Sequence, residues 1–160
     1  MILFSTVSTN ALNTNSSIKA TYGYEDYNHN GGVINISYNA QFVNHPAVAR
    51  GDGSKNNPYI IENWRVKTID IEHTDKYFEI NHCYIYYRDA IFFNRVNNGK
   101  IQDCVLDANQ GYYGIELFWS SKNEINDCSI ASYIYPLCLK SYSNNNIITV
   151  SYTHLRAHET

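Results

Sequence analysis

The chain has 160 residues, of which 44 % are hydrophobic and 17 % charged, so it can bury the core of one domain and is not expected to be disordered. A net charge of −3, from 12 Lys and Arg against 15 Asp and Glu, disfavours nucleic acid as a partner, and no apolar run is long enough to span a membrane. The 21 Asn residues disfavour helices, while the 15 Tyr and 18 Ile residues favour strands, and composition therefore predicts an all-β domain.

The chain before Gly51 predicts a start segment followed by a cap. Met1 to Ala11 pass from apolar to small residues like the end of a secretory signal, so 1–20 is expected to be a signal-peptide remnant or a disordered start. A signal would place the protein outside the cell or at its surface. Short apolar alternations at 33–36 and 41–43 predict that 21–50 forms an N-terminal cap or leading strands.

The central part of the chain is an internal repeat. The pattern Ile-x-(His/Asp)-Cys-x-apolar occurs around Cys83, Cys104 and Cys128, at spacings of 21 and 24 residues, and a second pattern recurs at 90–93, 114–117 and 136–139. Each unit holds brief alternations separated by turn residues and no helical periodicity. The repeat predicts an all-β, right-handed parallel β-helix over 51–149, with three short strands per coil and coils of about 21–24 residues.

Stacked coils place equivalent side chains above one another and so predict the core. Two interior walls are expected: Ile91, Phe93, Ile115, Leu117, Leu137 and Leu139 on one, and Ile80, Ile101, Ile125 and Ile147 on the other. The Cys column is interpreted as buried thiols, because parallel side chains make poor disulfide geometry and C-x-x-C spacing for zinc is missing.

Two segments precede the repeats: Gly-Asp-Gly-Ser at 51–54 and Asn-Pro-Tyr-Ile-Ile-Glu-Asn-Trp at 57–64. Together with the repeats, they resemble the NosD-like group of β-helix proteins. This group is related to the carbohydrate-binding and sugar-hydrolase (CASH) domains. The likeness covers about 51–149, with Cys where that group often has Asn, and it implies the same β-helix fold. Val150 to Thr160 resembles a translated sequencing adapter. The region 150–160 is therefore expected to be a non-native tail after a truncated β-helix, and its His and Glu residues carry no functional weight.

One column of polar residues precedes the Cys positions. His82, Asp103 and Asp127 could together hold a divalent metal, and the NosD-like resemblance implies an association with copper. The alternative is that they serve the turns through local hydrogen bonds. No other cofactor is expected.

A second set of candidates lies on the outward side of the predicted strands. Glu116 and Lys140, with Asp89 at the border, are candidate catalytic residues, because hydrolysis uses two carboxylates and a lyase uses a base and a cation. No tight Asp–Asp pair accompanies them, so a polysaccharide lyase or glycoside hydrolase is the second hypothesis.

Aromatic residues gather on the same face, and Tyr113, Phe118 and Trp119 are the predicted ligand-binding residues. Alternatively, such rings cover the turns. The first hypothesis is a secreted or cell-surface module, non-catalytic, that binds a polysaccharide or another extracellular protein or serves as an extracellular scaffold. A metal-binding accessory protein of the NosD type is the third.

Overall fold

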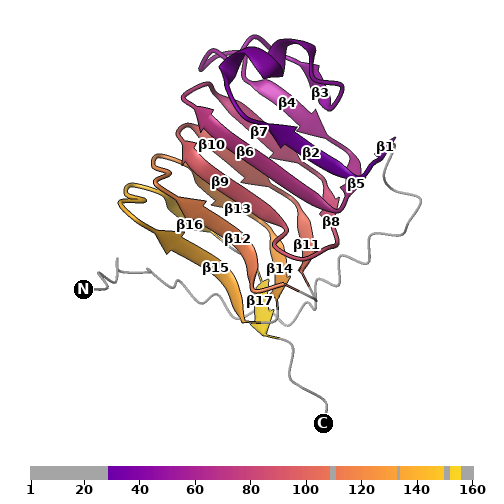
Figure 1. The fold of residues 1–160 in the computed structure, drawn as a ribbon, viewed down its shortest axis with the longest axis vertical. Coiled ribbons are helices and arrows are strands. Elements are labelled where there is room, and N and C mark those ends of the chain that lie inside the picture. The colour runs from indigo at the N-terminus through magenta and orange to yellow at the C-terminus, as the bar shows by residue number, and fades with distance from the viewer. Residues whose placement is uncertain (1–28, 109–110, 133, 150–151, 156–160) are drawn as a thin grey trace.

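The protein is a β-solenoid built from three sheets of stacked short strands. The computed structural model describes residues 29–108, 111–132, 134–149 and the backbone of 152–155. Its strands pair in parallel with the single exception of β3, which runs antiparallel to β4. Figure 1 shows the strands as rungs that descend from the N-terminal end to the C-terminal end. The predicted parallel β-helix with three strands per coil is confirmed within these residues.

Each coil contributes one strand to each of three sheets, here named A, B and C. Sheet A contains β1 (His29–Asn30), β5 (Trp64–Val66), β8 (Tyr84–Ile85), β11 (Val105–Ala108), β14 (Ser129–Ser132) and β17 (Tyr152–Leu155). Sheet B contains β2 (Val33–Ile36), β6 (Thr68–Thr74), β9 (Ile91–Val96), β12 (Tyr113–Phe118) and β15 (Tyr135–Lys140). Sheet C contains β3 (Val48–Arg50), β4 (Tyr59–Glu62), β7 (Phe78–Asn81), β10 (Gly99–Gln102), β13 (Glu124–Asn126) and β16 (Ile147–Thr149).

The register in sheet B confirms the alignment made from the repeats. Ile69, Ile91, Ile115 and Leu137 are successive partners, which makes the coils 22, 24 and 22 residues long. The first three of these side chains are fully buried, and their neighbours alternate between the core and the outward face. Leu139, also predicted to be inward, is 40 % exposed because β15 is the last strand of this sheet.

The prediction that Ile147 continues the second interior wall is wrong by one residue. Ile80, Ile101 and Ile125 are buried partners in sheet C, but the next partner of Ile125 is Ile148. Ile147 pairs with Glu124 on the outward side and is 59 % exposed. A slip of one residue reverses the face of a strand, and two adjacent isoleucines disguise such a slip in the sequence.

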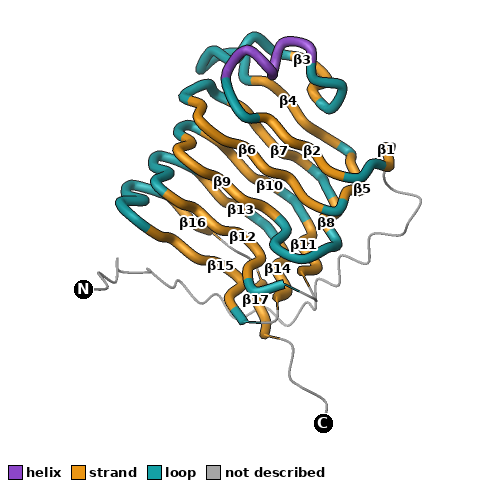
Figure 2. Tube along the Cα trace, viewed as in Figure 1, coloured by secondary structure: helices purple, strands orange, loops and turns teal. Residues whose placement is uncertain are grey.

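The N-terminal end of the solenoid is covered by its own chain. The 3-10 helix η2 (Asn39–Asn44) lies across this end (Figure 2). It buries Phe42, whose ring stacks on Tyr59 at 4.9 Å between centroids. Strands β1 and β2 already pair in parallel with β5 and β6, so the stack begins with leading strands inside 21–50. The expected signal remnant lies outside the described residues, and β17 adds a strand to sheet A inside the expected tail.

Gly51 and Gly53 are required by the turn that leads into β4. Both have positive φ angles, of 105° and 77°. A Cβ atom at Gly51 would lie 1.9 Å from the Pro58 carbonyl oxygen, and one at Gly53 would lie 2.4 Å from the Tyr59 ring. The Gly-x-Gly motif is therefore explained by close packing of the turn.

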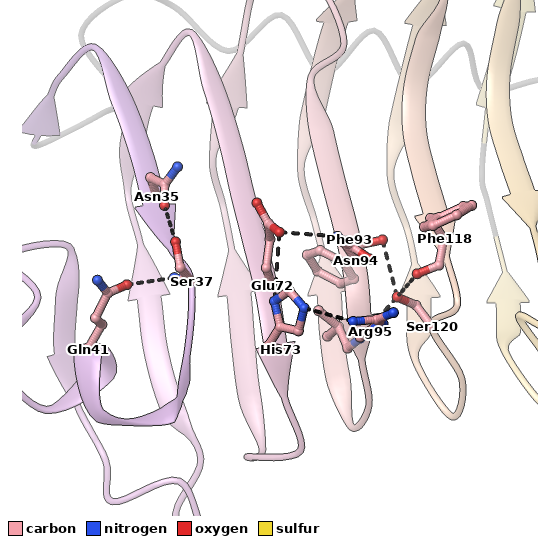
Figure 3. Close-up of polar contacts among 11 residues, drawn as sticks. Asn35, Ser37, Gln41, Glu72, His73, Phe93, Asn94, Arg95, Phe118 and Ser120 are labelled. Carbon is pink, nitrogen blue, oxygen red and sulfur yellow. Dashed lines mark hydrogen bonds and ion pairs between the residues drawn. The ribbon is translucent and has the colours of Figure 1, made fainter.

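A buried polar ladder runs along the turns between sheets B and C, and the sequence analysis missed it. The Ser120 hydroxyl accepts the Val96 N–H at 3.0 Å and donates to the Phe93 carbonyl at 3.1 Å (Figure 3). The Asn123 carboxamide accepts the Gly99 N–H at 2.9 Å and donates to the Val96 carbonyl at 3.1 Å. These side chains hydrogen-bond backbone groups at the tight turns, and the Val96 carbonyl also accepts the Ser121 N–H at 3.0 Å.

Candidate functional site

The three predicted ligand-binding aromatics lie at the two ends of one strand. Tyr113 is the first residue of β12, Phe118 is its last, and Trp119 follows it in the turn. Phe118 lies five residues after Tyr113, which corresponds to about 17 Å along the strand. The structure therefore divides the predicted set into two clusters, one at each border of the outward face of sheet B.

The Trp119 cluster is a column of stacked side chains at the turn after sheet B. The Arg95 guanidinium lies 5.6 Å from the centroid of the Trp119 ring and 3.3 Å from the His73 Nε2 atom, and Tyr142 packs edge-on against Trp119 at 5.6 Å. All four residues have positive φ angles between 49° and 59°. Figure 3 shows the N-terminal part of this column, where His73 contacts both Glu72 and Arg95. Trp119 is 46 % exposed and offers an accessible ring to a ligand.

The Tyr113 cluster contains two of the three candidate catalytic residues. The Lys140 ammonium donates to Glu116 Oε1 at 2.8 Å and to the Tyr113 hydroxyl at 2.9 Å, and it lies 4.1 Å from the Tyr113 ring centroid. The hydrogen bonds to Glu116 and Tyr113 raise the pKa of Lys140 above its ordinary value, although burial opposes this. Lys140 is thus held in its charged form and is unsuited to act as a base.

The third candidate, Asp89, shares a cavity with Glu116. The cavity has a volume of about 400 Å³ and lies on the outward side of sheet B, beside the loop that precedes β9. It is lined by Thr68, Asp70, Tyr87, Arg88, Asp89, Phe92 and Glu116. A volume of this order is typical of small-molecule sites, and the lining combines two aromatic rings with hydrogen-bonding groups.

The floor of this cavity is one row of the strand register. Phe92 of β9 is the partner of Asp70 on β6 and of Glu116 on β12, so its ring lies between two carboxylate-bearing positions. Asp89 is fixed in the loop because its Oδ1 atom accepts the Tyr113 N–H at 2.9 Å. Burial, together with the charges of Glu72 and Asp89, raises the pKa of Asp70 above its ordinary value.

A second cavity, of about 380 Å³, lies over sheet C. Its charged lining residues are Lys55, Glu79, Lys100, Lys122 and Glu124. In the register, Lys100 stands between Glu79 and Glu124, so cations and carboxylates alternate along the row. The row has two carboxylates and one ammonium, and Lys55 and Lys122 line the same cavity. Interleaved charges of both signs favour a solvated surface, and this cavity is the weaker candidate for a ligand site.

The candidate metal residues lie in one column, as predicted, but the column is a series of turns. His82, Asp103 and Asp127 have φ angles of 50°, 52° and 51°, and Asn63 occupies the same place one coil earlier with 62°. The His82 Nδ1 atom lies 3.6 Å from Asp103 Oδ2. Within the described part of the chain, no three His, Cys, Asp or Glu residues are grouped so that they could hold a metal ion. Asn and Asp tolerate the left-handed conformation, which accounts for their presence here.

The stacked cysteines form a ladder of thiols in the interior. Cys83, Cys104 and Cys128 are at most 1 % exposed, and all four cysteines of the chain are unbridged. Each of the three thiols contacts the carbonyl two residues before it, at 3.3, 3.2 and 3.1 Å. Burial raises the pKa of Cys104 well above its ordinary value, whereas the hydrogen bond with Cys104 lowers the pKa of Cys128. Burial, which the three thiols share, limits their access to reagents.

Sequence reasoning missed Thr68, Asp70 and Glu72 on the outward face of β6. The signal was present in the sequence, because Ile-Asp-Ile-Glu at 69–72 lies 22 residues before Ile-Phe-Phe-Asn at 91–94 and aligns with it. Asp70 thereby becomes the neighbour of Phe92. Glu72 accepts a hydrogen bond from the Asn94 carboxamide at 3.1 Å (Figure 3).

In the described residues, no helix is long and apolar enough to cross a membrane. Comparison with protein-family models, curated proteins and solved structures gives no match to this chain. Function must therefore be argued from the surface of the solenoid itself.

Proposed function

We propose that the outward face of sheet B is a glycan-binding surface, and that the protein is a secreted or cell-surface module that binds a polysaccharide without cleaving it. The observation that carries this proposal is the cavity over β6, β9 and β12, where the Tyr87 and Phe92 rings stand among carboxylate and hydroxyl groups. The cavity over sheet C also contains two aromatic residues and two carboxylates, but three lysines line it, whereas Arg88 is the one cation that lines the sheet B cavity.

The chemistry of the lining matches the two kinds of surface on a sugar ring. Aromatic rings stack against the apolar C–H face of a sugar, and Phe92 supplies such a ring on the cavity floor. Carboxylate oxygens accept hydrogen bonds from hydroxyl groups, and Asp70 and Asp89 bring such oxygens beside that ring. A few polar groups placed around an apolar surface are typical of small-molecule sites.

The same face extends beyond the cavity in both directions along the strands. Tyr113 and Tyr135 stack at 5.7 Å on one border, and Trp119 with Tyr142 lies on the other. The two borders are about 17 Å apart along the strands, so a chain of sugars lying along the strands would pass over the cavity between the two aromatic pairs. An extended ligand therefore fits this face better than a single sugar.

Affinity electrophoresis and a glycan array test the proposal. Phe92→Ala and Trp119→Ala are each expected to weaken binding about tenfold or more, because an aromatic at the centre of a contact often contributes over 1 kcal/mol. Tyr38→Ala is the matched control, since Tyr38 is 53 % exposed and lies at the N-terminal end before η2. It should leave binding within about twofold, and circular dichroism would verify that each variant is folded.

If neither substitution changes the affinity, the assignment of the glycan-binding surface to the outward face of sheet B is refuted. If no glycan is bound at all, the protein is better described as a scaffold or as a partner of another extracellular protein.

Glycoside cleavage is the second candidate, because Asp89 and Glu116 line the same cavity. Hydrolysis requires an acid and a second carboxylate on opposite sides of the scissile bond. Release of reducing sugar from a bound polysaccharide, abolished by Glu116→Gln, would establish this activity. Retained release in that variant would exclude Glu116 as the acid.

A further inference from the structure

The charge of the sheet B cavity is incompletely compensated by the protein. Glu116 is neutralised by its ion pair with Lys140, at 2.8 Å. Neither Asp70 nor Asp89 lies within 4 Å of a cationic side chain in the described residues, and Arg88, the one cation of the lining, forms no such pair there either. Two carboxylates thus face the cavity without a cation in contact.

These two carboxylates line the same cavity, where their like charges oppose each other. Burial, the charge of Glu72 and the charge of Asp89, in that order, disfavour ionisation of Asp70. A cationic group in this cavity would relieve the repulsion and donate a charge-assisted hydrogen bond to a carboxylate. A carboxylate-bearing sugar, such as a uronate, would increase the repulsion instead.

An aromatic face completes the surroundings that an ammonium group prefers. Phe92 is the direct strand partner of Asp70, so its ring borders the same space. An ammonium over an aromatic ring is attracted to the negative face of the ring. The Lys67 ammonium already lies 5.8 Å from the centroid of the Tyr87 ring beside the cavity, which shows that this rim accepts such a group.

We propose that this cavity recognises an amino sugar with a free amine, and that the protein prefers an amine-bearing polysaccharide to a neutral or acidic one. The proposal rests on the glycan-binding function proposed above and names its ligand class. The ammonium lies beside Asp70 and Asp89 at the Phe92 ring, while the exposed rings of Tyr135 and Trp119 contact neighbouring sugars. These flanking rings favour a glycan over a basic peptide, because they offer stacking surfaces on both sides of the charged cavity.

Isothermal titration calorimetry with two hexamers of equal length tests the proposal. One probe is the hexamer of β-1,4-linked glucosamine, and the other is the same hexamer with every amine acetylated, both at about pH 6, below the pKa of a free amine. The full-length chain is expected to bind the free-amine hexamer at least tenfold more tightly. Asp70→Asn and Asp89→Asn should each reduce this preference, the ratio of the two affinities, about fivefold.

The variants are chosen to keep the fold intact. Asn at position 89 retains an oxygen that can accept the Tyr113 N–H, and Asn at position 70 removes only a charge. Glu124→Gln, on sheet C, removes a carboxylate from a different face and should leave the preference unchanged.

The outcomes distinguish a failure of the amino-sugar proposal from a failure of the glycan-binding proposal. Equal or tighter binding of the acetylated hexamer overturns the amino-sugar proposal and leaves glycan binding standing. A preference that survives Asp70→Asn and Asp89→Asn also overturns it. Hexalysine bound as tightly as the free-amine hexamer would show that charge alone is read and would overturn the sugar assignment. If neither hexamer nor any glycan on the array binds, the proposed function fails as well.

Discussion

Substitution of Asn123 is the most direct test of how buried side chains stabilise the turns. It is 1 % exposed, and its carboxamide bonds the Gly99 N–H at 2.9 Å and the Val96 carbonyl at 3.1 Å. Asn123→Ala leaves the Gly99 N–H buried without its partner, which costs about 1–3 kcal/mol, whereas the Val96 carbonyl keeps the hydrogen bond from the Ser121 N–H at 3.0 Å. The expected loss in the free energy of unfolding is therefore about 1–3 kcal/mol, a substantial part of the roughly 5–15 kcal/mol of a typical domain.

Urea unfolding followed by circular dichroism measures this loss. Asn144→Ala is the matched control, because Asn144 is exposed and substitutions of exposed residues usually change stability by less than about 0.5 kcal/mol. Hydrogen exchange at the Gly99 amide gives a local reading, since that N–H should lose protection in Asn123→Ala even if the variant stays folded. Unchanged stability together with a protected Gly99 amide would refute the account of the ladder.

Three further predictions follow from the turns, the thiols and the acidic cavity. In the native protein, Ellman's reagent should label only Cys138 at an appreciable rate, because the other three thiols are buried. All four thiols should react after denaturation. Rapid labelling of a second thiol in the native protein would contradict the buried ladder. Asp103 has a φ of 52°, in the left-handed region, where a β-branched residue is disfavoured. Asp103→Val should therefore be less stable than Asp103→Gly by about 1–2 kcal/mol in urea unfolding. Equal stability of the two variants would show that the turn changes its conformation. Folding raises the pKa of Asp70, which means that the folded state disfavours the charged carboxylate. The resulting loss of folding stability is absent below the unfolded-state pKa and grows as the pH rises through the folded-state pKa. Asp70→Asn should therefore unfold at a higher urea concentration than the parent chain at pH 7, with a difference that shrinks towards about pH 3, and a difference independent of pH would contradict this cause.

The repeat made the architecture predictable, since the Ile and Cys columns can be aligned without any knowledge of the fold. The same alignment failed at Ile147, where a second isoleucine follows directly and the length of the preceding turn decides which one faces inward. Side-chain identity alone cannot settle a shift of one residue.

The site was harder to predict than the fold, because its residues are positioned by strand alternation, by register between coils and by a loop. Glu116 and Phe92 follow from strand alternation, but Asp70 requires the register to be extended one coil earlier than the first Cys repeat. Asp89 lies in a loop, whose path no periodicity fixes, and its direction depends on the bond to the Tyr113 N–H. The ion pair of Lys140 with Glu116 is diagonal, two residues out of register, and only the coordinates reveal it.

The one-strand-per-coil construction of sheet B has an evolutionary consequence. Each coil touches only the coils before and after it, so duplication of a stretch of about 22 residues would insert one more rung while neighbouring rungs kept their partners. The outer surface would lengthen by about 4.8 Å for every such duplication. Descendants of this chain could thus adjust the reach of their surface in fixed increments, by gene duplication and without redesign of the interior.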